Sequence, residues 1–561
     1  MKRRIVMLAL LGLLALGTTA VAATANGGGG HDGGDDGHGG PKINHIVVIY
    51  EENHSFDNLY GRWEGVNGLA NAKPANTIQQ SQAGTPFACL LQVDVNLTVP
   101  PLTPACDATD HFANAPFKID DVIPATATTC PPPGVFAPNG VLNGSGLPGG
   151  CTRDLVHRFY QEQFQIDNGR QDRYVLGSDA VGLVMGNYDT RSLPIYEYLH
   201  QRHHPDYAIL DDFFQGAFGG SFLNHQWLVA AAAPVWAGAP QSGPDDLHSI
   251  VDANGFPNAS YPLYHPATTV KDSNLTVKCG SGAPAGLACG DYAVNTTQPW
   301  YQPYAPGTAD SRRLPPLTSP NIGDELSAKK VSWAWYSGGW SNAAGVIGGP
   351  GWTNGDGPTC SDPNTTAGAV YPNCPDKLFQ FHHQPLNYWF DMRPGTWARQ
   401  QHLRDEQEFI DRAQSSDDEC KLKSVSFVKP IGAENEHPGY ASEATGSDHL
   451  VELIQAIESG RCAKDTMVVV TYDEFGGQWD HVSPPGQGGT PGPHDQWGPG
   501  TRIPALVVSP DLRSDFVVDH TQYDTTSILA TIEARFGLAP LGSRDAAVND
   551  LFSVFRARPA R

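Results

Sequence analysis

Two hydrophobic segments near opposite ends of this 561-residue chain both lead into acidic and amide side chains. The segments are residues 45–50 and 467–472, and the side chains that follow them are Glu52, Asn53, Asp473 and Glu474. Such β-branched runs are typical of strands that are buried on both faces of a parallel sheet. In open α/β sheets, ligands bind outside the carboxyl ends of the strands. We therefore expect these oxygen donors to form a divalent-cation site there, rather than four separate solvated loop residues.

The chain between these two ends alternates between expected strands and helices. Strands are expected at residues 207–210, 331–336, 425–428 and 505–509, and helices at residues 193–200, 448–458 and 525–536. Ser447 is available to cap the second helix, and Asp524 precedes the third, which ends at Gly537. This alternation predicts βαβ units and an α/β fold with a mainly parallel sheet.

The N-terminal 25 residues have the pattern of an export signal. A basic start is followed by an apolar stretch at residues 5–16 and by an A-x-A cleavage site at residues 23–25. The apolar stretch is too short for a stable membrane anchor. Residues 26–41, rich in Gly, His and Asp, are expected to be a flexible linker. The sequence thus predicts an exported protein, either periplasmic or extracellular.

Ten cysteines in an exported chain indicate disulfides rather than a thiol site. Nearest-neighbour pairing is the simplest arrangement, although sequence does not fix connectivity. It gives Cys89/Cys106, Cys130/Cys151, Cys279/Cys289, Cys360/Cys374 and Cys420/Cys462. Four of these loops would hold insertions rich in Pro and Gly. The stretches at residues 76–150 and 238–320 are expected to be disulfide-held insertions over the sheet.

The formal net charge of -23 argues against nucleic acid and against attraction to anionic membranes as functions. It leaves neutral or metal-bridged phosphates as possible substrates. Length alone would suggest several domains, but the two halves of the expected metal site lie at opposite ends of the chain. We therefore expect residues 42–561 to form a single catalytic domain with insertions.

Four further segments carry candidate functional side chains. The paired glycines before Ser221 allow a tight turn that lifts its hydroxyl into a cleft, although Gly-Gly-Ser is also a common turn. The doublet of His382 and His383 stands before a proline, and His437 follows the strand expected at residues 425–428. A single histidine there would most often be an ordinary hydrogen-bonded residue, but a doublet before proline is more typical of a site loop. His157 is the fourth candidate.

These residues carry a resemblance to a known family. Residues 52–61, Glu-Asn-His-Ser-Phe-Asp-Asn-Leu-Tyr-Gly, resemble the E-N-x-S-F-D-x-x-x-G motif of the bacterial phosphoesterase family of phospholipases C and secreted acid phosphatases. Residues 471–482 resemble that family's second signature, and residues 163–169, 331–336 and 435–439 support the resemblance more weakly. The resemblance runs from about residue 44 to residue 538 and is least complete in the insertions.

The resemblance implies an alkaline-phosphatase-like fold, with a twisted, mainly parallel sheet flanked by helices. The segment Phe-His-His-Gln-Pro at residues 381–385 is more similar to the acid phosphatase branch. Ser221 stands where the family places its hydroxyl nucleophile. The residues implied at the metal are Glu52, Asn53, Ser221, Asp473 and Glu474. Those implied around the phosphate are His157, His382, His383 and His437.

The expected chemistry is phosphoryl transfer, which needs an in-line nucleophile, neutralisation of charge on the phosphoryl oxygens and a proton for the leaving group. A divalent ion would lower the pKa of the Ser221 hydroxyl, and either His437 or His383 would protonate the leaving alcohol. Oxygen donors favour calcium, magnesium or manganese, and added histidine favours zinc.

The sequence thus predicts a metal-dependent acid phosphatase that acts on phosphate esters. Two alternatives stay open: a phospholipase C acting on phosphatidylcholine, and a secreted protein that binds a metal or carbohydrate without catalysis. The natural substrate and the oligomeric state are left open by the sequence.

Overall fold

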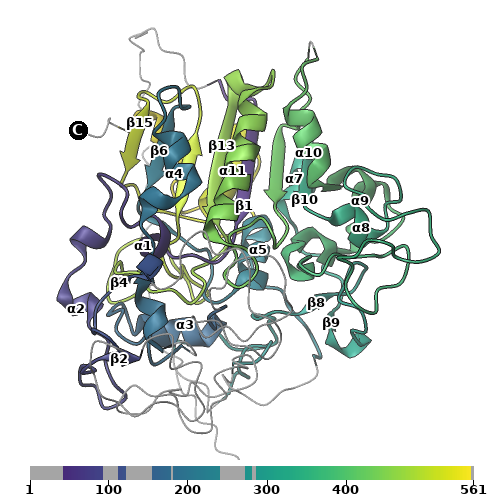
Figure 1. Ribbon diagram of the computed structural model, residues 1–561. Coiled ribbons are helices and arrows are strands. Elements are labelled where there is room, and N and C mark those ends of the chain that lie inside the picture. The colour runs from purple at the N-terminus through teal and green to yellow at the C-terminus, as the bar shows by residue number, and fades with distance from the viewer. Residues whose placement is uncertain are drawn as a thin grey trace, which may run out of the picture. The chain divides into compact units, whose positions relative to one another are not determined.

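An eight-stranded sheet dominates the computed structural model, which describes residues 42–91, 111–121, 154–178, 181–239, 272–280, 286–417 and 419–557 (Figure 1). In spatial order its strands are β11 (Leu403–Asp405), β10 (Trp333–Ser337), β12 (Val425–Lys429), β1 (His45–Glu51), β13 (Thr466–Tyr472), β14 (Ala505–Val508), β6 (Tyr207–Leu210) and β15 (Phe516–Asp519). Only β14 runs antiparallel to its neighbours in this sheet. The expected α/β class with a mainly parallel sheet is confirmed.

The two sequence segments that end in acidic residues are adjacent strands at the centre of this sheet. Parallel β1 pairs with β13 from His45 opposite Thr466 to Glu51 opposite Tyr472. Both strands are fully buried from their second residue onward, as expected for strands covered on two faces. Since the two strands end level, the side chains that follow them emerge at the same edge of the sheet.

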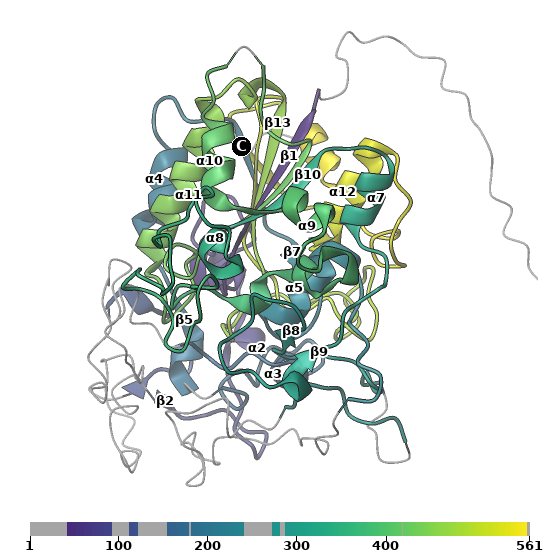
Figure 2. The same cartoon turned by 90° about the vertical axis from the view of Figure 1, so that its right-hand side faces the viewer.

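Helices cover both faces of the sheet. Figure 2 shows α4 (Pro194–Leu199), α10 (Glu406–Ala413) and α11 (Glu443–Glu458) on one side of the strands, and α7 (Ile322–Ala328) and α12 (Thr526–Phe536) on the other. The helix α5 (Ser221–Ala230) packs against α7 and α12. The strands and helices expected from the sequence are therefore present, although β10 begins at Trp333, two residues later than expected.

The start of α11 differs from the expectation. The helix begins at Glu443 because the Ser442 hydroxyl accepts a hydrogen bond from Thr445 N and caps it there. Ser447, the expected cap, lies inside the helix, and its hydroxyl accepts from Ile195 N of α4 at 2.9 Å. The expected cap was therefore wrong, and the contact with α4 explains why Ser447 is buried.

Shorter elements surround the carboxyl edge of the sheet. The helices are α1 (Phe56–Leu59), α2 (Pro74–Thr77), α3 (Phe159–Ile166), α8 (Trp340–Ala344) and α9 (Trp397–His402). Two-residue strands form the pairs β2 (Leu90–Leu91) with β3 (His111–Phe112), β4 (Phe117–Lys118) with β5 (Gly186–Asn187), β7 (Phe213–Phe214) with β16 (Tyr523–Asp524), and β8 (Gln298–Pro299) with β9 (Arg313–Leu314).

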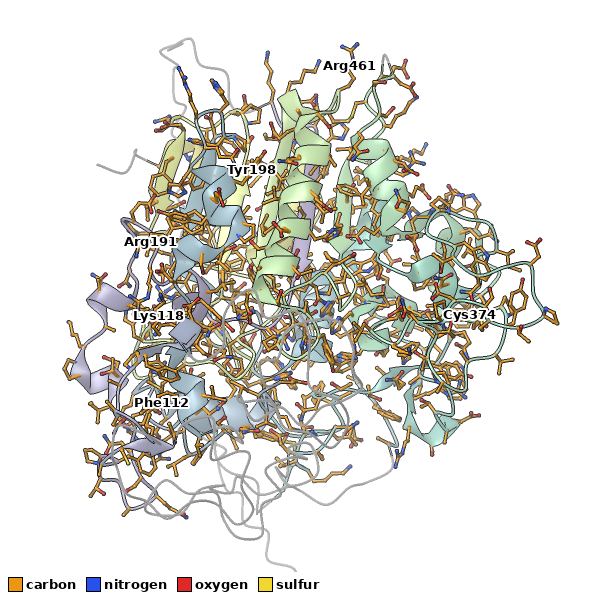
Figure 3. All side chains as sticks on the ribbon, in the orientation of Figure 1. Phe112, Lys118, Arg191, Tyr198, Cys374 and Arg461 are labelled. Carbon is orange, nitrogen blue, oxygen red and sulfur yellow. A yellow bond between two sulfur atoms is a disulfide. The ribbon has the colours of Figure 1, made fainter. Side chains whose placement is uncertain are left out.

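Three of the five expected disulfides are present, namely Cys279–Cys289, Cys360–Cys374 and Cys420–Cys462. Cys374 lies beside α8, where its backbone N donates to Asn342 O at 2.8 Å (Figure 3). The expected pairs Cys89/Cys106 and Cys130/Cys151 involve residues outside the described ranges, as do the export signal and the linker. Within the described ranges, the helices are all too short or too polar to cross a membrane.

The Cys420–Cys462 disulfide closes a loop of 42 residues, whereas Cys279–Cys289 closes one of 10. In the chain-entropy model, removing them lowers the free energy of unfolding by about 4 and about 3 kcal/mol respectively. We therefore expect the C420A/C462A variant to be the less stable of the two double variants. Denaturant unfolding under non-reducing conditions tests this order, and a larger loss in C279A/C289A would contradict it.

Candidate active site

Ser221 is the first residue of α5 and follows a turn that requires two glycines. Gly219 has φ +89°, and a Cβ on it would lie 2.7 Å from Phe159 N. A Cβ on Gly220 would lie 2.8 Å from the backbone oxygen of His157. The glycines therefore allow the segment before α3 to approach Ser221 closely, which brings His157 to the candidate site.

The Ser221 hydroxyl lies among three oxygens of the predicted metal ligands. Its Oγ is 3.3 Å from Glu52 Oε2, 3.4 Å from Asn53 Oδ1 and 3.3 Å from Glu474 Oε1. All four side chains are buried. One hydroxyl proton satisfies one acceptor at a time, so this shell of oxygens has more acceptors than donors.

Asp473 lies beside this shell and organises its backbone. Its Oδ1 accepts hydrogen bonds from Asn53 N at 3.2 Å and from Glu474 N at 2.8 Å. Its Oδ2 has no hydrogen-bond partner among the described residues and lies 3.8 Å from His225 Nδ1. The side chains expected at the two strand ends are thus brought together, as the strand-end rule predicts.

The three carboxylates of the site are unfavourable as charges without a cation. Burial and the nearby Asp473 raise the pKa of Glu52 and of Glu474 well above its ordinary value. Burial also raises the pKa of Asp473. Burial disfavours the ionised form, and each negative neighbour disfavours it further.

The four predicted histidines also gather at this site, in two different positions. His157 Nε2 lies 3.3 Å from Glu474 Oε1, and His383 Nδ1 lies 3.1 Å from Glu52 Oε1. His382 stacks edge-on against His383, with ring centroids 4.3 Å apart. His383 and His437 are buried, whereas His157 and His382 are partly exposed.

His437 positions Asn53. Its Nδ1 donates to Pro438 O at 2.9 Å, because a carbonyl only accepts, and its Nε2 accepts from Asn53 Nδ2 at 2.9 Å. These two bonds fix a neutral tautomer and turn the Asn53 oxygen toward Ser221. Burial also lowers the pKa of His437 and of His383 well below its ordinary value and lowers that of His382 to about 3.

The sequence analysis missed two site residues. Lys429, the last residue of β12, forms a buried ion pair with Glu52, and its ammonium donates to Tyr50 O at 2.7 Å. His225 lies one helical turn after Ser221, and its ring stacks on that of His383 at 4.8 Å. The strand-end rule applied to β12 and the i, i+4 spacing on α5 were the signals that would have found them.

A second buried network ties the two signature segments together behind the site. Arg502 Nη2 lies 3.1 Å from both Asp57 Oδ1 and Asp480 Oδ2, and His481 Nδ1 bonds Asp57 Oδ2 at 2.5 Å. The Ser55 hydroxyl donates to Trp479 O at 2.7 Å. The serine and aspartates of the two motifs therefore hold the loops that carry the candidate ligands, rather than forming part of the site.

The residues at Ser221 fit a divalent cation. Three buried carboxylates and an amide oxygen converge, while Asp473 Oδ2, His225 Nε2 and His383 Nε2 have no hydrogen-bond partner among the described residues. Ligand atoms of Glu52, His225 and His383 all lie within 4.8 Å of one another. The donor set of oxygens with imidazole nitrogens alongside is one that calcium, magnesium, manganese or zinc accepts.

Comparison with known proteins identifies the family to which this chain is similar. The model of the Phosphoesterase family matches residues 43–539. Phospholipase C A of Mycobacterium tuberculosis is 34% identical over 545 residues, which cover 91% of this chain and 77% of the relative. Phospholipase C B of the same species is 24% identical over the same shares of both chains. A solved protein of the alkaline phosphatase superfamily from Vibrio parahaemolyticus gives a TM-score of 0.28 at 9% identity over 65% of each chain.

Gly476 provides a test of how closely the two signature segments must approach. It has φ +62°, and a Cβ on it would lie 2.1 Å from Asn53 O. Left-handed strain together with this overlap should destabilise G476A by about 3 kcal/mol or more. The matched control is G489A, because Gly489 has φ +86° and open space around its Cβ position. Equal unfolding free energies for the two variants would show that the close approach does not matter.

Proposed function

This chain belongs to the Phosphoesterase family and is a phosphoric ester hydrolase, and we propose that it is an exported, metal-dependent acid phosphatase with Ser221 as its nucleophile. The observation that carries the proposal is the position of the Ser221 hydroxyl among Glu52, Asn53 and Glu474, at 3.3–3.4 Å from their oxygens. A serine with only a structural role would not need to lie beside the buried carboxylates of Glu52 and Glu474. Export is supported by the three disulfides.

The first chemical step in this proposal is attack by Ser221 Oγ on phosphorus. The bond from phosphorus to the ester oxygen breaks, the leaving alcohol takes a proton, and the phosphoryl group becomes attached to Ser221. Ser221 opens α5, a helix of 10 residues, whose free N–H groups at that end favour the negative charge of the phosphoserine. Water then attacks the phosphorus and releases Ser221.

The residues that would hold the metal ion are Glu52, Asn53, Ser221, Asp473 and Glu474, with His225 and His383 alongside. When bound, a divalent ion lowers the pKa of a coordinated hydroxyl and offsets charge on phosphoryl oxygens. Lys429 contributes a fixed positive charge at Glu52. His437 holds the Asn53 amide in place through its hydrogen bond.

The geometry changes which histidines we propose as the proton donor. His437 Nε2 already accepts a hydrogen bond from Asn53, and His383 is buried against Glu52. His157 and His382 are the partly exposed histidines of the site, so a leaving group reaches them from solvent more readily than it reaches His437 or His383. We therefore assign proton transfer to one of these two and assign His437 to positioning.

Phospholipase C activity on phosphatidylcholine is the second candidate, and the naming of the two mycobacterial relatives as phospholipases C favours it. Both activities use the same nucleophile and the same charge stabilisation. They differ in the group that leaves phosphorus and in the surface that must admit it. The resemblance of residues 381–385 to the acid phosphatase branch is our reason for proposing phosphomonoesters as the preferred substrates.

Replacing Ser221 should separate catalysis from metal binding. S221A removes the nucleophile while leaving the carboxylates, so we expect turnover to fall by about 10³-fold or more with the fold and most of the metal retained. D473N replaces a charged ligand by a neutral one, so we expect it to lose metal as well as activity. Metal content after dialysis and initial rates test both variants. Wild-type turnover in S221A would exclude Ser221 as the nucleophile.

Side-by-side assays of a soluble phosphomonoester and of phosphatidylcholine vesicles, each with and without chelator, test the substrate class. We expect a higher kcat/KM for the phosphomonoester, with a maximum at about pH 5 to 7. The phosphate dianion raises the pKa of the histidines that face it, in opposition to burial, and their protons are lost as pH rises. Preference for phosphatidylcholine would select the second candidate, and a maximum above about pH 8 would contradict the acid phosphatase assignment.

A further inference from the structure

A second group of carboxylates and histidine lies on the other face of β1 from Ser221. Tyr50 points toward α5, since its ring lies 5.0 Å from that of His225, and alternation along the strand turns Glu51 toward the opposite face. Tyr472, which pairs with Glu51, confirms the direction, because its hydroxyl donates to Glu436 beside α11. Glu51 is therefore separated from the candidate active site by the sheet itself.

On this face, three side chains present ligand atoms to one another. Glu406 opens α10, Glu434 lies in the loop after β12, and His449 belongs to α11. His449 Nε2 lies 3.3 Å from Glu406 Oε1 and 3.8 Å from Glu434 Oε2. One ligand atom from each residue fits within 4.8 Å of the others. This is the spacing of donors around a single cation.

Glu51 is the independent observation that points to a ligand. Its side chain is fully buried, and neither carboxylate oxygen has a hydrogen-bond partner among the described residues. The Glu51 carboxylate interacts electrostatically first with Lys429 and then with His449, Glu406 and Glu434, so it lies within electrostatic reach of this group. An unpaired buried carboxylate is strongly unfavourable, and a cation bound beside it would remove this penalty.

We propose that Glu406, Glu434 and His449, with the buried carboxylate of Glu51 on the same face of the sheet, form a second divalent-cation site, distinct from the one at Ser221. A set of carboxylate oxygens with one imidazole nitrogen suits zinc better than calcium, because calcium prefers oxygen ligands alone. The side chain of Glu434 is 43% exposed, which leaves a path from solvent for the ion. The site would join β1 and the loop after β12 to α10 and α11, behind the segment that carries His437.

Protonation of His449 is the alternative to a bound metal ion at this group. Burial lowers the pKa of His449, but Glu406 and the other carboxylates around it outweigh burial and raise it to about 10. Protonated His449 would pair with Glu406, Glu434 and Glu452 without any metal. The two occupants exclude each other, because a metal ligand needs the nitrogen lone pair that the proton occupies. Retention of zinc therefore distinguishes them.

The test weakens the site at Ser221, which keeps Glu52, His225 and His383, and compares the zinc bound before and after the second site is changed. The D473N/E474Q variant of the full chain is stripped with a chelator, incubated with zinc chloride and passed through a desalting column. We expect the bound zinc to fall by about one equivalent when E406Q and E434Q are added. The matched control is E452Q, which changes a 75% exposed carboxylate that contacts the same histidine. It should keep the zinc.

The result does not depend on hydrolysis, so it is independent of the proposed function. No zinc retained by folded D473N/E474Q would overturn the proposal, as would retention that E406Q and E434Q leave unchanged. A zinc-dependent rise in the melting temperature of D473N/E474Q, absent after E406Q and E434Q, provides a second readout. Circular dichroism confirms that each variant is folded before its zinc is measured.

Discussion

The pairing of β1 with β13 brings buried carboxylates close together, and the rest of the site has to offset the repulsion between them. Level strand ends place Glu52, Asp473 and Glu474 together in a buried volume beside Ser221. Like charges held together in a low dielectric repel strongly, so the fold needs nearby positive charge to hold them ionised. Lys429 supplies part of it from the next strand, and the unpaired oxygens and nitrogens at the site are suited to a cation that supplies more.

The same constraint explains why the signature segments contain more polar residues than the site uses. Holding repelling carboxylates together requires loops that do not move apart. Arg502 joins Asp57 of the first signature to Asp480 of the second, and the Ser55 hydroxyl reaches the backbone of Trp479. Removing either aspartate would leave a buried arginine partly unpaired, which is more destabilising than the loss of a surface contact. The two signature segments thus supply both the candidate ligands and the buried ion pairs and hydrogen bonds that hold the ligand-bearing loops together.

Sequence reasoning located the strand ends correctly because a strand buried on both faces has a clear composition. The residues between 467 and 472 are almost all β-branched or aromatic, and the acidic side chains follow at once. It missed Lys429 because a lysine at the end of an apolar segment looks like an ordinary solvated terminus. Only the strand order, which puts β12 next to β1, shows that this lysine faces Glu52.

The separate roles of His383 and His437 could not be predicted from the sequence, for a related reason. His437 and His383 were equivalent candidates for proton transfer, because a sequence shows that an imidazole is present but not which nitrogen is already engaged. In the structure the Pro438 carbonyl and the Asn53 amide occupy both nitrogens of His437. The α11 cap was predicted wrongly at Ser447, because the sequence does not show that the Ser447 hydroxyl is already engaged by Ile195 N while Ser442 caps the helix.

Glu51 and Glu52 show how one strand end can serve two faces of a sheet. Because side chains alternate along β1, Tyr50 packs toward α5, whereas Glu51 turns toward α10 and α11. Glu52 follows the end of the strand, and its carboxylate lies beside Ser221. Burial raises the pKa of Glu51 to about 8, so its charge is held only if a positive group compensates it. Lys429 binds the backbone oxygen of Tyr50 and the carboxylate of Glu52, and it is also the largest favourable electrostatic partner of the Glu51 carboxylate. Further positive charge for Glu51 comes from the helix side, from the proton on His449 or from a metal ion in its place.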